Sequence, residues 1–597
     1  MVKLRYSDSH SLFTMAGTND AKFHDLCERF WKWRLQDSPE FATFCGFHEF
    51  DDKMDDLSIP FYSSKLGIMK QFLNEAKQID SATLSKSAKL DLFIFIEDLE
   101  CVINGFEFES YYFPINFLEG PHLSMNLQIG WMKFKTETDY LKYVKRMQSF
   151  AKQLKSVKEI LKEAIGKGYV SSIESVKEVP EQLQKLIKES TEKTGDFYKP
   201  FKETPKQVSL EKLHDLEDQL TDVLCKELVP ALESLKDFLV NTYMKNVRQK
   251  PGICNLPNGE KFYQACIKFH TSYDVTPQEI HDLGLKEVAR IKGNMIKIFQ
   301  EEGLPPNIAE ASKILFERKD LCCNTAEELL EFVKDICFNK IQPLLPKLFK
   351  DLPAIPLKIS EAPSIMTSSP PAFYLAGTPD GSRSGTYYIN LTKVDACPKY
   401  EIPALSLHEG EPGHHTQASS AMITKSPNFR CYMEDMKYYL TPSRFPMHTA
   451  YVEGWGLYCE SLGEELGLYP DNFQKLGRYN FEIHRACRLV IDTGIHSFGW
   501  SAEDAFTYMT ENCPMDPWFI RNEINRYITW PGQALGYKYG EIKLWEFRRK
   551  AQNELGVLFD VREFHKVVLN AGAMPLNLLE KLVDDYISET KTAAQKE

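Results

Sequence analysis

The sequence predicts a mainly α-helical protein with one small antiparallel β-sheet. Along most of the 597 residues, apolar side chains recur at steps of three and four, the spacing that gives a helix one buried face. Residues 357–392 break this pattern, because short β-branched and aromatic runs alternate there with turns that contain proline and glycine. With 43% apolar and 12% aromatic residues, the chain is able to bury one large core.

Helices are expected throughout the first half of the chain. Residues 20–47 carry an apolar stripe at helical spacing, and residues 83–105 and 136–168 repeat the pattern. Residues 111–130 are expected to be a connecting loop, because two prolines and two glycines interrupt them. Charged amphipathic helices should follow at residues 180–196, 210–248 and 276–302.

Three short runs predict the strands of the sheet. They are residues 357–361, 372–376 and 386–391, and the turn at residues 378–382 contains the sequence Pro-Asp-Gly. A sheet edge of this kind can hold an extended peptide by adding it as another strand, and it can equally be a structural hairpin.

A second set of helices is expected after the sheet, at residues 449–466, 472–499, 502–512, 521–528, 537–555 and 561–570. We therefore expect one helical unit over residues 1–597. Its N-terminal helical half would span about residues 15–350, and the half at about residues 351–590 would hold the densest group of metal-binding residues.

Charge and composition argue against several classes of protein. A net charge of −12 disfavours nucleic-acid binding, which needs a concentrated basic face. No run reaches the ~20 apolar residues of a membrane span, and the first ten residues lack the apolar core of a signal peptide. The 14 cysteines are scattered, which indicates buried thiols. We expect a cytoplasmic protein with no membrane or nucleic-acid partner.

The densest metal-binding chemistry lies between His408 and His415. The sequence His-Glu-Gly-Glu-Pro-Gly-His-His holds three histidines and begins with the His-Glu pair of a zinc-protease helix. Pro412 occupies the position at which the His-Glu-x-x-His motif has its second histidine. Glu409 has the position of a general base, and the second ligand is either His414 or His415.

A regular helix could not bring His408 and His414 to one metal ion. Six helical residues would separate them by ~9 Å along the axis and by ~120° around it, whereas zinc needs both nitrogens at ~2 Å. Proline removes a backbone donor, and glycine takes conformations that other residues avoid. We therefore predict a helix break at Pro412 and Gly413.

The third ligand is expected on the helix at residues 449–466. Glu453 lies there among apolar residues, where a carboxylate without a partner is costly. A metal ion would be one partner and an arginine another, so both interpretations stay open. Glu460 lies two turns further along the same face, where it could orient a ligand.

Two further stretches carry candidates for contact with a substrate. Arg488, Asp492 and His496 follow at steps of four and share one helix face. They form either a buried ion-pair network or a surface on which His496 faces the substrate. Tyr527 and Tyr537 flank a Pro-Gly turn, and a tyrosine hydroxyl can donate a hydrogen bond to a developing oxyanion.

Four blocks, in order along the chain, resemble the signatures of domain-of-unknown-function family 885, which is placed among the gluzincin-like metallopeptidases. They are His408-Glu-Gly-Glu-Pro-Gly-His-His-Thr-Gln, Glu453-Gly-Trp-Gly-Leu-Tyr-Cys-Glu, Arg485-Ala-Cys-Arg-Leu-Val-Ile-Asp-Thr-Gly-Ile-His and Arg526-Tyr-Ile-Thr-Trp-Pro-Gly-Gln-Ala-Leu-Gly-Tyr. The stretch around Phe30-Trp-Lys-Trp resembles the N-terminal part of the same family, so the likeness covers most of the chain.

This resemblance implies a helical fold with a cleft, similar to thimet oligopeptidase, angiotensin-converting enzyme and the metal-dependent carboxypeptidases, with zinc in the cleft. It implies that His408 and His414 bind the zinc ion together with Glu453, and that Glu409 is the general base. The two extra residues in the motif leave the choice between His414 and His415 open.

The sequence thus favours a zinc-dependent hydrolase, specifically a peptidase that acts on short peptides or small amides. Glu409 would activate water, and Tyr527, Tyr537 or His496 would stabilise the oxyanion. Two other classes fit the same residues. One is a non-catalytic helical binding or scaffold protein, and the other is a metal-dependent lyase or transferase that acts on a small amide or amino-acid-like substrate.

Overall fold

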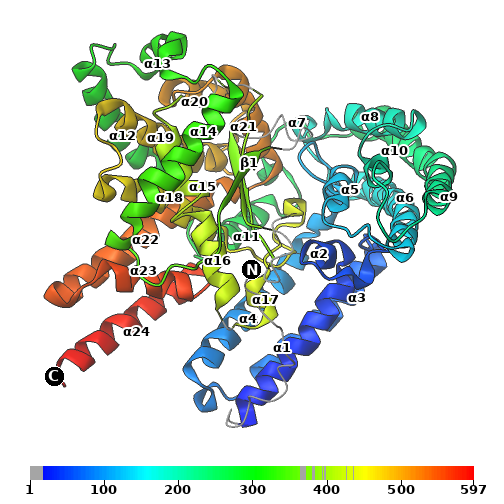
Figure 1. Cartoon of the computed structure of the whole chain (residues 1–597), viewed down its shortest axis with the longest axis horizontal. Helices are drawn as coiled ribbons and strands as arrows, with labels where there is room; N and C mark the ends of the chain where they lie inside the picture. The colour runs from blue at the N-terminus through cyan, green and yellow to red at the C-terminus, as the bar shows by residue number, and fades with distance from the viewer. Residues whose placement is uncertain are drawn as a thin grey trace.

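The computed structural model describes residues 18–362, 371–378, 384–392, 394, 398–424, 426–434 and 436–596. Over these residues the chain is mainly helical, and three short strands form one small sheet (Figure 1). Most of the expected turn at residues 378–382, and the first ten residues, lie outside the described part of the chain. The predicted fold class is confirmed as mainly helical with a small sheet.

Residues 18–241 fold into a series of helices, which are α1 (Thr18–Asp37), α2 (Pro39–Phe44), α3 (Ile59–Lys77), α4 (Lys86–Gly105), α5 (Pro121–Ile129), α6 (Glu137–Lys167), α7 (Ile173–Val176), α8 (Val179–Thr191), α9 (Leu210–Val223) and α10 (Val229–Asn241). Figure 1 shows α5, α6 and α8 to α10 as a lobe on the right, with the blue helices α1, α3 and α4 below it.

Local sequence sets the ends of these helices. Helix α6 begins at a capping box, in which Thr136 and Asp139 each accept a hydrogen bond from the other's backbone N–H, and it stops at Gly168 in the left-handed conformation. The loop expected at residues 111–130 is wrong in part. Pro121 starts α5 instead of interrupting it, because the first N–H of a helix has no partner in any case.

The sheet is mixed. Strands β1 (Lys358–Glu361), β2 (Ala372–Leu375) and β3 (Thr386–Ile389) lie in the order β1-β3-β2. Strand β3 pairs antiparallel with β2 and parallel with β1, so the expected antiparallel sheet is wrong. A run of β-forming residues marks a strand, but its neighbour and direction depend on the path of the chain between strands.

The rest of the chain is again helical around the sheet. Its helices are α11 (Gly259–Thr271), α12 (Pro277–Glu301), α13 (Ile308–Glu317), α14 (Ala326–Asp335), α15 (Ile402–Glu409), α16 (His414–Ile423), α17 (Asn428–Cys431), α18 (Thr449–Leu466), α19 (Asn472–His496), α20 (Ala502–Asn512), α21 (Pro517–Thr529), α22 (Gly536–Leu555), α23 (Val561–Asn570) and α24 (Leu576–Ala594).

Two apolar clusters hold this second half together. The sheet, α15, α18 and α22 to α24 share one cluster, and α12, α13 and α19 to α21 share the other. Helix α18 packs extensively on α22, and α12 packs on α19. Because α15 and α18 lie in the same cluster, the packing around them fixes their polar residues relative to one another. The division of the chain into halves near residue 350 stays a prediction.

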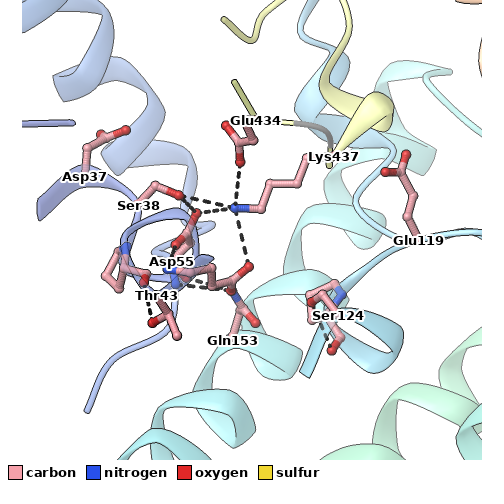
Figure 2. Close-up of polar contacts among 12 residues, drawn as sticks. Asp37, Ser38, Thr43, Asp55, Glu119, Ser124, Gln153, Glu434 and Lys437 are labelled. Carbon is pink, nitrogen blue, oxygen red and sulfur yellow. Dashed lines mark hydrogen bonds and ion pairs between the residues drawn. The ribbon is translucent and has the colours of Figure 1, made fainter. Parts of the chain in front are cut away.

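A buried lysine ties the chain before α18 to the N-terminal helices. Lys437 forms ion pairs with Asp55, with Glu40 of α2 at 3.4 Å and with Glu434 at 3.5 Å. Figure 2 shows its ammonium group between Asp55 and Glu434. Burial raises the pKa of Glu434, but the nearby cations outweigh burial and lower this pKa to about 2.

Glu119 forms a second contact between the N-terminal half and the chain before α18. Its carboxylate accepts hydrogen bonds from the backbone N–H groups of Tyr438 at 2.8 Å and Tyr439 at 2.5 Å, and from Nε1 of Trp530 at 2.8 Å. Burial raises the pKa of Glu119 to about 7. Groups from the N-terminal half therefore hold the chain that leads into α18, the helix that carries Glu453.

The structure also bears on two expectations about the whole chain. Across the described ranges, no helix has an apolar run long enough to cross a membrane. The thirteen cysteines in the described part of the chain are free thiols, as their scattered positions predict.

Replacing Lys437 with methionine should destabilise the protein by about 3–5 kcal/mol, because buried carboxylates would lose their cation. Lys591→Met is the control, since Lys591 pairs with Glu554 where both side chains are 43% exposed, and such pairs contribute about 0–1 kcal/mol. Urea unfolding followed by circular dichroism measures both variants. Equal unfolding free energies for the two would contradict the stabilising role of Lys437.

Candidate metal centre

The helix that carries His408 is interrupted directly after the next residue. Helix α15 ends there, a turn at residues 410–413 follows, and α16 begins at His414. A Cβ atom at Gly413 would lie 1.9 Å from the carbonyl oxygen of His408, so only glycine allows this close approach. The predicted break at Pro412 and Gly413 is confirmed.

The break brings three possible metal ligands together. Nε2 of His408 and Nε2 of His414 each lie 3.5 Å from Oε2 of Glu453. One ligand atom from each of the three residues lies within 4.8 Å of the others. Ligands ~2.1 Å from a tetrahedral zinc ion stand ~3.4 Å apart, so these distances fit a site with two histidines and one glutamate.

Helix α18 also contacts the His408 ring on the side opposite Nε2. Nδ1 of His408 lies 2.8 Å from Oε1 of Glu460. In the neutral imidazole it donates a hydrogen bond to this oxygen, and the lone pair of Nε2 is then on the side of Glu453. Gly456 lies between the two glutamates on this helix, and a Cβ atom there would come within 2.6 Å of the ring. The glycine therefore makes room for the imidazole.

His415 lies outside this group. Its Nε2 donates to the carbonyl oxygen of Ile355 at 2.9 Å, and its Nδ1 accepts from the Tyr374 hydroxyl at 3.2 Å. Both ring nitrogens are therefore engaged, and burial lowers the pKa of this imidazole. Of the two candidates for the second ligand, the geometry favours His414.

The carboxylates and the histidines change one another's proton affinity. Burial lowers the pKa of His408, but hydrogen bonds to Glu453 and Glu460 outweigh burial and raise this pKa to about 9. Burial raises the pKa of Glu453, but the two histidines hold it well below its usual range. Glu453 is therefore anionic at neutral pH, as a metal ligand must be.

Glu409 presents a carboxylate beside the three possible ligands. Its side chain is buried, and in the described part of the chain no hydrogen bond or ion pair engages its oxygens. Burial raises the pKa of Glu409, and charges on His408 and His414 oppose this effect. A carboxylate with free oxygens and a raised pKa is suited to take a proton from water.

Tyr537 is the tyrosine that lies close to this centre. Its hydroxyl oxygen accepts hydrogen bonds from Nη2 of Arg526 at 3.2 Å and from Nε2 of Gln533 at 3.3 Å. Its own proton has no acceptor among the residues that the structure describes. Burial raises the pKa of Tyr537, and the charge on Glu453 raises it further, which places the hydroxyl within electrostatic range of the centre.

Tyr527 and His496 are engaged elsewhere. The Tyr527 hydroxyl donates to Glu523 at 2.6 Å and accepts from Nε of Arg488 at 2.9 Å. Nδ1 of His496 accepts from the backbone N–H of Ile253 at 3.2 Å, and its Nε2 donates to the carbonyl oxygen of Tyr527 at 2.9 Å. Burial lowers the pKa of His496 to about 3. The structure therefore does not support an oxyanion role for either side chain, and both hold α19 against α21.

Sequence reasoning missed two groups that shape the centre. Trp455 donates a hydrogen bond from Nε1 to the carbonyl oxygen of Pro412 at 2.9 Å, which holds the turn against α18. Arg526 and Gln533 orient the Tyr537 hydroxyl. The glycines on both sides of Trp455 are a signal of close packing. The arginine contact depends on how the Pro-Gly turn orients α22 against α21, which the sequence pattern does not specify.

The comparisons with known proteins agree with the observed fold. Residues 39–583 match the family described as bacterial protein of unknown function (DUF885). Among solved structures, the chain is similar to a "putative lipoprotein" from Colwellia psychrerythraea, with a TM-score of 0.87, 26% identity, and 96% of this chain and 99% of that chain covered. It is also similar to a "putative lipoprotein of unknown function" from Shewanella oneidensis, with a TM-score of 0.72, 17% identity, and coverage of 94% and 99%. No curated protein matches the chain significantly.

Replacing Gly413 with alanine should abolish zinc binding, because a methyl group cannot lie 1.9 Å from the His408 carbonyl oxygen and the turn must open. Gly293→Ala in α12 is the matched control, since a Cβ atom there meets no atom within 4 Å. Mass spectrometry of metal content after dialysis against zinc measures both, and only the control should hold one zinc ion per chain. Full zinc content in Gly413→Ala would show that the turn does not need this close approach.

Proposed function

We propose that this chain, which belongs to the DUF885 family, is a zinc-dependent hydrolase that cleaves peptide or related amide bonds in short substrates. One observation carries the proposal. The buried carboxylate of Glu409 has no hydrogen-bond donor among the described residues, and it lies beside two histidines and a glutamate with tetrahedral spacing. A buried carboxylate with a shifted pKa beside a group of possible metal ligands is typical of a general base.

The donor set suits zinc. Histidine nitrogens and a carboxylate oxygen are typical ligands of catalytic zinc sites, which keep one position open for water or substrate. His408, His414 and Glu453 would hold the ion, and Glu460 would keep His408 in the required tautomer. When bound, zinc would polarise the substrate carbonyl group and lower the pKa of water.

The chain's own residues would then share the steps of hydrolysis. Glu409 would take a proton from the attacking water while the water oxygen bonds to the carbonyl carbon. The same carboxyl group would deliver this proton to the leaving nitrogen as the C–N bond breaks, so that a carboxylic acid and an amine result. Tyr537 would donate its free proton as a hydrogen bond to the carbonyl oxygen while negative charge develops there.

A relationship to the gluzincin-like metallopeptidases, with a cleft similar to that of thimet oligopeptidase and angiotensin-converting enzyme, is part of the same proposal. The order of the residues supports it: a histidine followed directly by the candidate base Glu409, then a second histidine, and then a glutamate on the later helix α18. The peptide or amide substrate and the cytoplasmic location stay predictions from the sequence.

Glu409→Gln should lower kcat by about 10²–10⁴ and leave zinc content unchanged, because it removes the proton acceptor without removing a ligand. Glu411→Gln, in the same turn, is the control, since Glu411 accepts a hydrogen bond from Gln342 away from the three ligand atoms. A library of short peptides incubated with zinc-loaded protein measures the rates. Unchanged hydrolysis in Glu409→Gln, or hydrolysis that survives removal of zinc, would exclude this mechanism.

Glu460→Ala should weaken zinc binding about 10- to 100-fold, because His408 would lose the group that fixes its tautomer. Glu464→Ala on the same helix should have no effect, since this side chain is 48% exposed and pairs with Arg478. Competition with a fluorescent zinc chelator gives both affinities. Identical values for the two variants would show that Glu460 does not orient a metal ligand.

A further inference from the structure

Three arginines surround Tyr537 on the side of the centre formed by α19 and α21. We call Arg485, Arg488 and Arg526 the arginine cluster. Nη2 of Arg526 lies 3.2 Å from the Tyr537 hydroxyl, and the guanidinium carbons of Arg488 and Arg485 lie 4.5 Å and 5.9 Å from the centre of its ring. The cluster is also connected to the centre, because Arg485 lies 3.9 Å from Glu460, which accepts the hydrogen bond of His408.

The cluster carries more positive charge than its carboxylate partners balance. Glu523 pairs with both Arg488 at 2.8 Å and Arg526 at 3.2 Å. Among the described residues, Arg485 forms an ion pair with Glu460 at 3.9 Å, and Glu460 already accepts the hydrogen bond of His408. Three guanidinium groups thus share two carboxylates, and arginine stays charged at any relevant pH. Buried charges are usually paired, so among the residues that the structure describes the cluster lacks one anion.

Other acidic groups near the cluster do not remove this excess. Glu401 lies within electrostatic range of Arg485, but it accepts a hydrogen bond from Asn480 at 2.7 Å, and burial raises its pKa to about 7. Glu409 and Glu453 belong to the centre, where their two charges would balance a divalent ion.

The cluster has unused hydrogen-bonding capacity and an open side. Nε of Arg485, Nη1 of Arg488 and Nε of Arg526 have no hydrogen-bond partner among the described residues. The side chain of Arg526 is 17% exposed, close to the 14% of Glu453, so both can be reached from outside. Nη2 of Arg526 already donates to Gln533 and Tyr537, and Nη1 donates to Glu523, so a carboxylate would be bound by the charge of Arg526 and by its remaining donors.

We propose that the substrate carries a free carboxylate one residue beyond the bond to be cleaved, and that Arg526 binds this carboxylate with support from the charge of Arg485. The inference rests on the proposed hydrolase function and specifies its substrate class. Tyr537 contacts Arg526 and lies within electrostatic range of Glu453, so the carboxylate and the cleaved amide belong close together. One extended residue spans only ~3.5 Å, which fits the C-terminal residue of a peptide or the amino acid of an N-acyl amino acid.

A structural role alone explains only part of the cluster. Arg488 bonds Tyr527 and Glu523 and thereby joins α19 to α21. Arg526 is one turn from Glu523 on the same helix, where it adds a second cation to a carboxylate that Arg488 already balances. A second arginine on one buried carboxylate leaves a positive charge that this carboxylate does not balance, which is costly away from water.

The first test compares the wild-type protein on paired peptides that differ only in a free or an amidated C-terminus. We expect kcat/KM at the last peptide bond to be at least 100-fold higher for the free acid. Equal cleavage of acid and amide that still requires zinc and Glu409 would overturn the substrate inference and leave the proposed function in place. The carboxylate could belong to a peptide or to an N-acyl amino acid. Comparing kcat/KM for a peptide and an N-acyl amino acid with the same last residue shows which of the two is the better substrate.

The second test measures binding without catalysis. Its result therefore tests the carboxylate site even if the protein does not hydrolyse peptides. Calorimetry on zinc-loaded Glu409→Gln protein compares an N-acetyl amino acid with its amide, and only the acid should bind. Arg526→Gln should weaken this binding at least tenfold, and Arg526→Lys should restore part of it. Arg521→Gln is the matched control on α21, because Arg521 pairs with Glu503 where the side chains are 54% and 68% exposed.

The two measurements separate the outcomes. Acid-selective binding that depends on Arg526, without any zinc-dependent hydrolysis, would support the carboxylate site and reject the proposed reaction. Binding of acid and amide with equal affinity, or acid selectivity that Arg526→Gln retains in a folded protein, would reject the carboxylate site. Circular dichroism of each variant shows whether it is folded, and the wild-type comparison of acid with amide needs no variant.

Discussion

The close approach of Gly413 to the carbonyl oxygen of His408 is the constraint on which the rest of the centre depends. It allows the chain to reverse within four residues, so that histidines six positions apart face one point and not different sides of a helix. Helix α18 completes the arrangement because Gly456 admits the His408 ring and Glu460 holds it. The absence of a Cβ atom at Gly413 and at Gly456 therefore allows the three possible ligand atoms to lie close together.

The N-terminal half acts on this centre through the chain that leads into α18. Lys437 and Glu119 bind that chain to segments that precede it by hundreds of residues. Because a buried charge that loses its partner is costly, these contacts favour one position of the chain. Helices with no candidate site residue thus contribute to the site by determining where Glu453 enters it.

Charge distinguishes the two sides of the centre. On one side, Glu409, Glu453 and Glu460 surround the histidines, and on the other the arginine cluster surrounds Tyr537. The tyrosine connects them, since its oxygen accepts from an arginine while its proton stays available. One hydroxyl group would then contact the carbonyl oxygen of a substrate and also position the guanidinium group that binds its carboxylate.

The sequence by itself determined the helical class, the bounds of α18, α20 and α23, and the need for a break between His408 and His414, because apolar periodicity and residue spacing are local properties. Only the tertiary structure showed that the sheet is mixed, and only its geometry favours His414 over His415 as a ligand and Tyr537 over Tyr527 as a hydrogen-bond donor. Each choice depends on which distant group lies opposite. The two histidines, the two tyrosines and the strands have similar local sequences. They differ in which distant residues they contact, and a local sequence pattern does not contain that information.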